Sequence, residues 1–164
     1  MELRILDHSE FLQQSFTMFR VLADNMSRLH PGETVTAEDY DAWLAYQNAH
    51  FPEKTFLVLE QGGTLAGYLQ YSVSGDVLTV EELEITSEWQ NGIALRHLLR
   101  AMPELLPEGI QTVEAYIHKD NERSRRLAER LGLRPAGETE SGKSLLYSAP
   151  KNLLKSVAQR HLNY

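Results

Sequence analysis

The hydrophobic pattern of the chain changes its period several times, and these changes set the order of its helices and strands. Apolar residues recur at helical spacing in two segments up to His50, which Pro31-Gly32 separates, and from Thr55 onward the period changes to two. Helical spacing returns after Gly92 and again after Asn121, and the alternating segment Thr112–His118 lies between the two. Helices interleaved with strands in this way are typical of a mixed α/β domain.

Capping residues and prolines give the expected helix boundaries. Asp7 or Ser9 can cap the first helix, and Thr36 with Asp39 three residues later is close to a capping box for the second. We expect Pro103 to stop the third helix, because a proline cannot donate the next helical hydrogen bond.

The expected order of elements is a strand, two helices, three strands, a helix, a strand, a helix, two strands and a last helix. We therefore expect one α/β (α+β) domain over residues 1–148 and a C-terminal amphipathic helix over residues 149–164. The apolar stripe of that last helix consists of Leu153, Leu154, Val157, Ala158 and Leu162.

Composition excludes several classes of protein. The 164 residues include 42% hydrophobic residues, which suits one folded domain, and no cysteine, which excludes disulfides, thiolate nucleophiles and cysteine-ligated metals. No apolar run is long enough to cross a bilayer, and the start MELRILDHSE does not resemble a signal peptide. We expect a soluble, cytoplasmic protein without a membrane partner.

The charge is negative and uneven. The net charge is −7, but residues 141–164 hold four basic residues and no acid, so the first 140 residues hold 12 basic and 23 acidic residues, a net −11. Because phosphate neutralisation dominates nucleic-acid binding, a body this acidic predicts no nucleic-acid partner. The basic residues of the last segment fit a solvated helix end.

Four side chains near the ends of two expected strands suit proton transfer. Alternation places Glu82 and Glu84 on one face of the strand Val77–Ile85, and Tyr116 with His118 on one face of Thr112–His118. The acids could instead form only a solvated face, and the aromatic pair could be an ordinary half-exposed strand surface. The six histidines show no metal-ligand spacing, so we expect no metal site.

The segments N-E-R-S-R-R-L-A-E-R-L-G-L and E-Q-G-G-T-L-A-G-Y, together with the order of elements, resemble the GNAT superfamily of acetyl-CoA-dependent N-acetyltransferases over residues 1–148. This resemblance implies a mixed central sheet of about seven strands with helices on both faces. It also implies that acetyl-CoA, as co-substrate, lies between the strand ending at Ile85 and the strand ending at His118. The acetyl group would pass to a primary amine of a small molecule or peptide.

The resemblance also implies the cofactor-binding residues. They are Ile85, Thr86, Ser87, Gln90, Asn91, Gly92, Ile93, Ala94, Leu95 and Asn121. The pyrophosphate would lie on the N–H groups of residues 90–95, at a helix N-terminus, and a backbone N–H near residues 85–87 would polarise the acetyl carbonyl. Asn121 also suffices as a helix N-cap, and the arginines that follow it could meet a phosphate or pair with Glu122 and Glu129.

Two departures from the family pattern bear on activity. The family's loop reads Arg/Gln-x-x-Gly-x-Gly/Ala. Gln90 fits its first position in one register, whereas a shift by one residue places Gly92 and Ala94 at the small positions, and we prefer that second register. Ala128 stands where many members carry a tyrosine that protonates the leaving thiolate.

Two hypotheses follow for the function. The first is an N-acetyltransferase in which Glu82, Glu84, Tyr116 or His118 transfers protons. The second is a GNAT-like binding module without catalysis, which could form a homodimer through its last helix.

Overall fold

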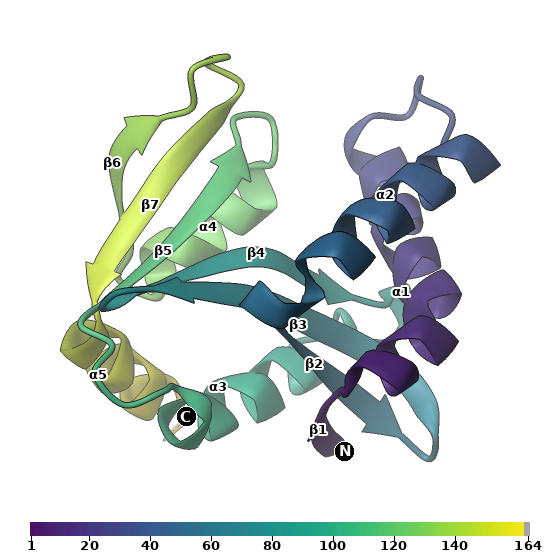
Figure 1. Cartoon of the computed structure of the whole chain (residues 1–164). Helices are drawn as coiled ribbons and strands as arrows, with labels where there is room; N and C mark the ends of the chain where they lie inside the picture. Colours follow the sequence, from purple (N-terminus) through teal and green to yellow (C-terminus); the bar gives the residue numbers. More distant parts are fainter. Residues whose placement is uncertain (163–164) are drawn as a thin grey trace. The chain divides into compact units, whose positions relative to one another are not determined.

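The computed structural model describes residues 1–162 and shows the expected order of elements (Figure 1). Over these residues it contains seven strands and five α-helices in a single α/β domain. The strands are β1 (Glu2–Ile5), β2 (Lys54–Gln61), β3 (Thr64–Ser74), β4 (Val77–Ile85), β5 (Thr112–His118), β6 (Arg134–Glu138) and β7 (Ser144–Pro150). The helices are α1 (His8–Leu29), α2 (Ala37–His50), α3 (Ile93–Leu105), α4 (Glu122–Arg130) and α5 (Lys151–Leu162). Two short 3₁₀ helices, η1 (Phe51–Glu53) and η2 (Ser87–Trp89), follow α2 and β4.

The strands form one mixed sheet in the order β1-β2-β3-β4-β5-β7-β6, which confirms the fold expected from the sequence. The β4–β5 pair is parallel, and its register runs from Val77↔Thr112 to Val80↔Ala115. Strand β5 continues to His118 in antiparallel pairing with β7. The parallel ladder therefore covers only the first part of β4. The part of β4 beyond Val80 contains Glu82 and Glu84 and ends at Ile85.

The chain groups into two compact units. The first unit contains residues 1–71 and 82–95, and the second contains residues 72–81 and those from Arg96 onward. Strand β4 contributes to both units, with Val77–Glu81 in the second and Glu82–Ile85 in the first.

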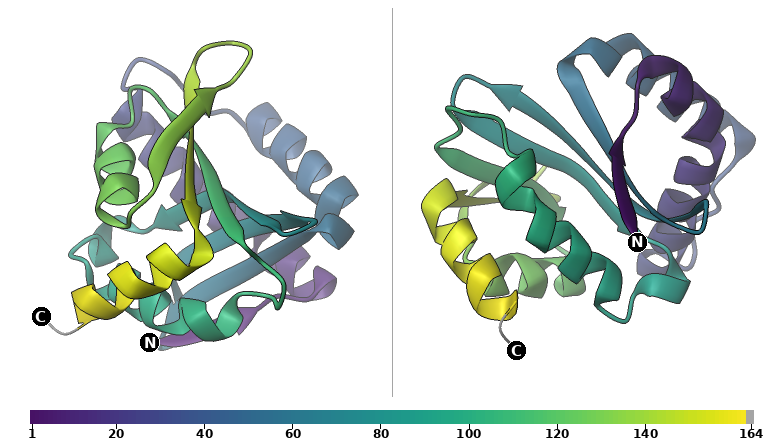
Figure 2. Two further views of the ribbon diagram at one scale, coloured as in Figure 1. Left: turned by 90° about the vertical axis from the view of Figure 1, so that its left-hand side faces the viewer. Right: turned by 90° about the horizontal axis from the view of Figure 1, so that it is seen from below.

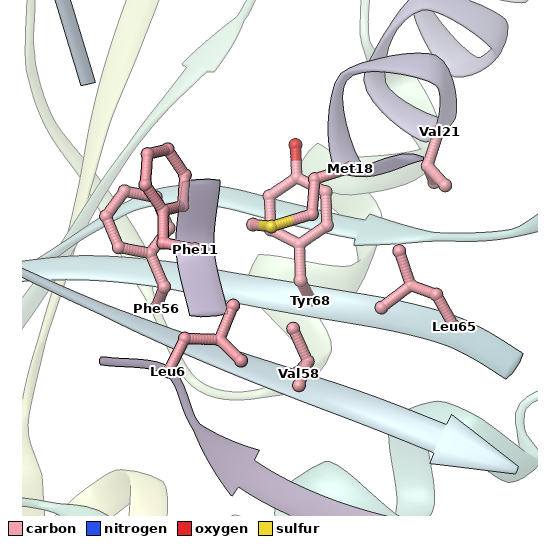
Figure 3. Packing of buried hydrophobic residues seen from close by; sticks show 8 residues of the cluster. All are labelled: Leu6, Phe11, Met18, Val21, Phe56, Val58, Leu65 and Tyr68. Carbon is pink, nitrogen blue, oxygen red and sulfur yellow. The ribbon is translucent and has the colours of Figure 1, made fainter. Parts of the chain in front are cut away.

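In the first unit, apolar side chains of α1 meet those of β2 and β3 (Figure 3). The buried cluster consists of Leu6, Phe11, Met18, Val21, Phe56, Val58, Leu65 and Tyr68. Phe11 stacks on Phe56 with ring centroids 4.4 Å apart, and Trp43, Leu44 and Phe51 pack against the same cluster. Phe56 and Val58, two residues apart on β2, thus meet the apolar side chains of α1, while Leu57 and Leu59, which alternate with them, are buried as well.

Both helices of the first unit begin with a capping box. The Asp7 carboxylate accepts the Glu10 N–H at 2.8 Å, and the Glu10 carboxylate accepts the Asp7 N–H at 2.8 Å. Thr36 and Asp39 make the same exchange at the start of α2. Each box satisfies two N–H groups that lack a helical partner, so Asp7 rather than Ser9 sets the start of α1.

In the second unit, α4 packs against β7. The Arg125 Nε donates to the Tyr147 hydroxyl at 3.2 Å, and Tyr147 and Ala128 are both buried. Gly132 follows α4 with φ of +95°, the left-handed conformation expected at a helix C-terminus. Figure 2 shows α5 beginning directly at the end of β7.

The structure corrects one expected boundary. Pro103 does not stop α3, which continues to Leu105, and the Leu106 N–H still donates to the Met102 carbonyl at 3.0 Å. A proline lacks only its own N–H, so the residues after it can keep their helical bonds through a last turn. In α5, Leu154 is buried and Leu153 is exposed, while the side chains of Val157, Ala158 and Leu162 lie outside the described residues. Over the described part of the chain, no helix is long and apolar enough to span a membrane.

Gly67 lies on β3 where β4 passes close by. A Cβ added there would stand 2.6 Å from the Glu84 carbonyl oxygen and 2.7 Å from the Ile85 Cδ1. We predict that Gly67→Ala lowers the free energy of unfolding by about 1–3 kcal/mol, because the backbone of β4 must shift. Gly137→Ala is the matched control, since a Cβ at that strand position meets nothing within 4 Å. Urea unfolding of both variants tests this, and equal stabilities would contradict it.

Candidate active site

Glu82 lies on β4 and accepts a hydrogen bond on each carboxylate oxygen. The Tyr68 hydroxyl donates to Oε2 at 2.7 Å, and the Trp43 indole N–H donates to Oε1 at 3.2 Å. Figure 3 shows Tyr68 on β3 with its hydroxyl directed away from the strand. Burial raises the pKa of Tyr68 well above its usual value, and the charges of Glu82 and Glu84 add to the effect. Tyr68 therefore stays protonated and donates its hydroxyl hydrogen to Glu82.

Glu84 lies two residues further along β4, on the same face. Its Oε2 accepts a hydrogen bond from the Asn25 side-chain amide on α1 at 2.5 Å. Burial raises the pKa of Glu84 from 4.5 to about 7; the charge of Glu82 also raises it, whereas the Asn25 bond lowers it. A carboxyl group with a pKa near neutrality can take a proton from a reacting group and release it again, which is the property of a general base.

The loop that follows β4 is tied to the first unit by its backbone and by Gln90. The Thr86 N–H donates to the Ala66 carbonyl of β3 at 2.9 Å. The Gln90 amide donates to the Ile85 carbonyl at 2.8 Å and to the Asn25 Oδ1 at 3.1 Å. The Gln90 side chain therefore faces α1 and the end of β4.

The start of α3 has the features of an anion site. Gly92 has φ of +91° and Ala94 is completely buried, so the fold of the loop itself needs small residues at both positions. The first turn of α3 contains no acid. The Ile93 N–H donates to the Asn91 side chain at 3.1 Å, and a helix of this length offers further first-turn N–H groups to a phosphate. Over the described residues, the buried Thr86 Oγ1 has no hydrogen-bond partner, which leaves a polar atom for a ligand or water beside this turn.

The remaining expected site residues belong to the second unit. The Tyr116 side chain is exposed, and the His118 Nδ1 accepts the Asp120 N–H at 3.1 Å. The Asn121 Oδ1 accepts the Ser124 N–H at 3.1 Å, so Asn121 is the N-cap of α4. In the described residues, no group of three or more histidines, aspartates or glutamates is arranged to hold a metal ion.

Two arginines of α4, Arg125 and Arg126, make hydrogen bonds or ion pairs within the protein. Arg126 pairs with Glu122, as helical spacing predicts, and the Arg125 guanidinium donates to the Tyr147 hydroxyl and to the Lys119 carbonyl. Arg134, at the start of β6, donates to two backbone carbonyls beside α4. Of these bonds, the one from Arg125 to Tyr147 joins α4 to β7. An open depression lined by Arg123, Arg126, Arg130 and Arg134 lies beside α4.

The sequence predicted Glu82 and Glu84 as candidates but not the residues that donate hydrogen bonds to them, which are Trp43, Tyr68 and Asn25. Trp43 and Tyr68 carry apolar rings that fit a core stripe, and Asn25 lies on the first helix, far from β4 in sequence. Their contacts arise from the packing of α1 and α2 against the sheet, which strand and helix periodicity does not report. The sequence did contain one indication of these contacts: Trp43, Tyr68 and Asn25 each place a polar atom in or beside an otherwise apolar face, and such an atom needs a hydrogen-bond partner.

A family model described as the acetyltransferase (GNAT) family matches residues 18–133. The chain therefore belongs to the GNAT acetyltransferase family. This membership supports acetyl transfer as the general class of reaction. A comparison with curated protein sequences finds no match.

Solved structures support the same fold. An acetyltransferase from Thermus thermophilus has a TM-score of 0.71 at 20% identity, covering 92% of this chain and 97% of that one. The PaiA N-acetyltransferase from Thermoplasma acidophilum, crystallised with coenzyme A, has a TM-score of 0.68 at 16% identity, with coverage of 92% and 99%. The ribosomal-protein-S18-alanine N-acetyltransferase from Escherichia coli has a TM-score of 0.58 at 16% identity, with coverage of 91% and 92%.

The raised pKa of Glu84 predicts a pH-dependent stability. Between pH 4.5 and about 7 the unfolded carboxyl has lost its proton while the folded one keeps it, so the free energy of unfolding falls as the pH rises. Between about pH 5 and pH 8, we expect the free energy of unfolding of the parent protein to fall by about 2–3 kcal/mol more than that of Glu84→Gln. Urea unfolding of both proteins at each pH measures this. Glu88→Gln, which removes an exposed carboxylate from the next loop, is the control and should follow the parent protein. A stability difference independent of pH would contradict the burial of the charge.

Proposed function

We propose that the protein transfers an acetyl group from acetyl-CoA to a primary amine of a small molecule or peptide, with Glu84 as the general base. The observation that carries this proposal is the largely buried Glu84 carboxyl, whose pKa of about 7 suits proton transfer, beside the loop that leads into α3. The proposed transferase domain spans residues 1–148. The proposal includes a cytoplasmic location and no nucleic-acid or membrane partner, in keeping with the charge of the chain.

The reaction needs an unprotonated amine against the thioester carbonyl. Glu84 takes a proton from the acceptor ammonium, directly or through one water, and the free amine attacks the acetyl carbon. The carbon–nitrogen bond forms, the carbon–sulfur bond breaks, and coenzyme A leaves as the thiolate. The second amine proton is lost as the amide forms and passes to the thiolate through solvent, with Tyr116 and His118 as the proposed groups that relay it.

The residues around the loop fit acetyl-CoA as substrate. The first-turn N–H groups of α3 would bind the pyrophosphate, with Gly92 and Ala94 allowing close approach of the backbone. The Thr86 N–H already donates to the Ala66 carbonyl. The N–H groups of Ile85 and Ser87 are therefore the proposed donors that would polarise the acetyl carbonyl. The Thr86 hydroxyl, buried and unbonded among the described residues, supplies a polar atom at the same turn.

The acceptor class follows from charge. An acidic body and the Glu82–Glu84 pair favour cationic acceptors, such as polyamines, aminoglycoside-like compounds or basic peptide N-termini. The structural likeness to an alanine N-acetyltransferase acting on ribosomal protein S18 supports including a peptide amine among the candidates.

One observation favours a second candidate, a GNAT-like binding module. Ala128, at the position of the family's thiolate-protonating tyrosine, is only 6% exposed, so no acid reaches the leaving group from that helical position. A thiol is a sufficiently good leaving group for many members to work without this tyrosine. We therefore place the module second and make it an outcome of the experiments below.

Binding of the co-substrate is tested first by thermal melting with and without acetyl-CoA. At about 100 times its dissociation constant, acetyl-CoA should add about 2.7 kcal/mol to the stability and raise the melting midpoint clearly. An unchanged midpoint at millimolar acetyl-CoA would favour a module that does not bind this substrate.

Turnover is tested with a panel of amines and a thiol-detecting reagent. Because the chain has no cysteine, all thiol released is coenzyme A. We predict that kcat/KM rises with pH through about 7 as Glu84 loses its proton, and that Glu84→Gln lowers kcat at least about 100-fold at unchanged acetyl-CoA affinity. Tyr116→Phe and Glu82→Gln, measured in parallel, show whether those groups share the proton transfer. An undiminished rate in Glu84→Gln would remove Glu84 from the mechanism.

A further inference from the structure

A chain of side-chain hydrogen bonds ends on the Glu84 carboxylate. The Arg28 guanidinium donates to the Gln90 Oε1 at 3.4 Å, and the Gln90 Nε2 donates to the Asn25 Oδ1 at 3.1 Å. The Asn25 Nδ2 donates to the Glu84 Oε2 at 2.5 Å. The Ile85 carbonyl accepts from both amides, at 2.8 Å from Gln90 and 3.2 Å from Asn25. Two helical residues and one loop residue are thus linked to the end of β4.

The partners fix the direction of this chain. A guanidinium only donates, whereas a carboxylate and a backbone carbonyl only accept. The Gln90 amide must therefore turn its oxygen to Arg28 and its NH₂ group to Asn25 and Ile85. The Asn25 amide in turn keeps its oxygen toward Gln90 and its NH₂ group toward Glu84 and Ile85. Reversing either amide would place two acceptors or two donors against each other.

We propose that Gln90 is a positioning residue for Glu84: its side-chain amide fixes the orientation of Asn25, which then presents an N–H to the carboxylate. The inference rests on the proposed function, since it takes Glu84 as the base. It gives the Gln90 side chain a role other than binding the pyrophosphate, which the resemblance to the family assigns to this segment. An N–H held toward the carboxylate stabilises its charged form and so keeps it able to accept a proton.

The other groups around Glu84 define what the variants change. Its own strand contributes the Glu82 carboxylate, β3 contributes the Tyr68 hydroxyl, and α1 contributes Asn25. Arg28 is the cation at the first hydrogen bond of this series, where it donates to Gln90. Among these groups Asn25 favours the charged form of Glu84, opposing the effects of burial and of Glu82. A change in the Asn25 orientation therefore acts directly on the titration of Glu84.

The test measures the pKa of Glu84 by NMR, from the ¹³C shift of its side-chain carboxyl carbon, assigned by its loss in Glu84→Gln. We expect Gln90→Met, which keeps the length of the side chain but removes its amide, to raise this pKa by about one pH unit. Gln90→Glu should raise it further, because its carboxylate attracts the Asn25 NH₂ group away from Glu84. In an Asn25→Leu background, Gln90→Met should produce no additional shift, since the residue it orients is gone.

Gln14→Met is the matched control, because Gln14 also lies in the first unit but donates to Glu60 instead. It should leave the Glu84 titration unchanged. An unchanged pKa in both Gln90→Met and Gln90→Glu would overturn the proposal. So would failure of both variants to fold while Gln14→Met folds, because Gln90 would then be a residue of general stability.

The pH profile of kcat/KM separates this inference from the proposed function. If Glu84 is the base, the rising part of the profile moves in Gln90→Met by the same amount as the NMR titration. A shifted titration with an unmoved profile would leave the positioning role intact and remove Glu84 as the base. An unshifted titration, with turnover still lost in Glu84→Gln, would overturn the positioning role and leave the proposed function in place.

Discussion

Two partly buried carboxylates on one strand face, separated by a single residue, form the constraint on which the rest of the site depends. A buried negative charge is costly, and a second one beside it is more so. The protein meets this by giving the two groups different surroundings. Glu82 accepts from Tyr68 and Trp43, whereas Glu84 accepts from Asn25 and is left with a pKa of about 7. The apolar cluster of α1, β2 and β3 serves this arrangement, because it fixes the rings and the helix that carry the donors.

Most of the fold could be predicted because its signals are local. Thr36 and Asp39 form the box that their spacing suggests, Gly132 adopts the left-handed conformation, and Asn121 caps α4. Each of these depends on a few neighbouring residues, which a single sequence contains in full. Pro103 shows the limit of this reasoning, since a proline weakens a helix at its own position but the residues after it can complete the turn.

The site was predicted only in part, for a physical reason. Strand alternation is sufficient to place Glu82 and Glu84 on one face, but it says nothing about which helix will lie over that face. Asn25 reaches β4 across 59 positions of sequence, and Gln90 turns its amide toward α1 instead of outward from the loop. Such contacts are set by how helices pack on a sheet, so no short motif announces them. The family match then supplies the chemistry of acetyl transfer, and the contacts show how this chain could carry it out.

The backbones of β3 and β4 approach so closely at Gly67 that not even a methyl group would fit between Gly67 and the Glu84 carbonyl. No larger residue can therefore replace Gly67 unless the backbone of β4 moves. Homologous chains in which β3 and β4 approach as closely as they do here should keep a glycine opposite Glu84.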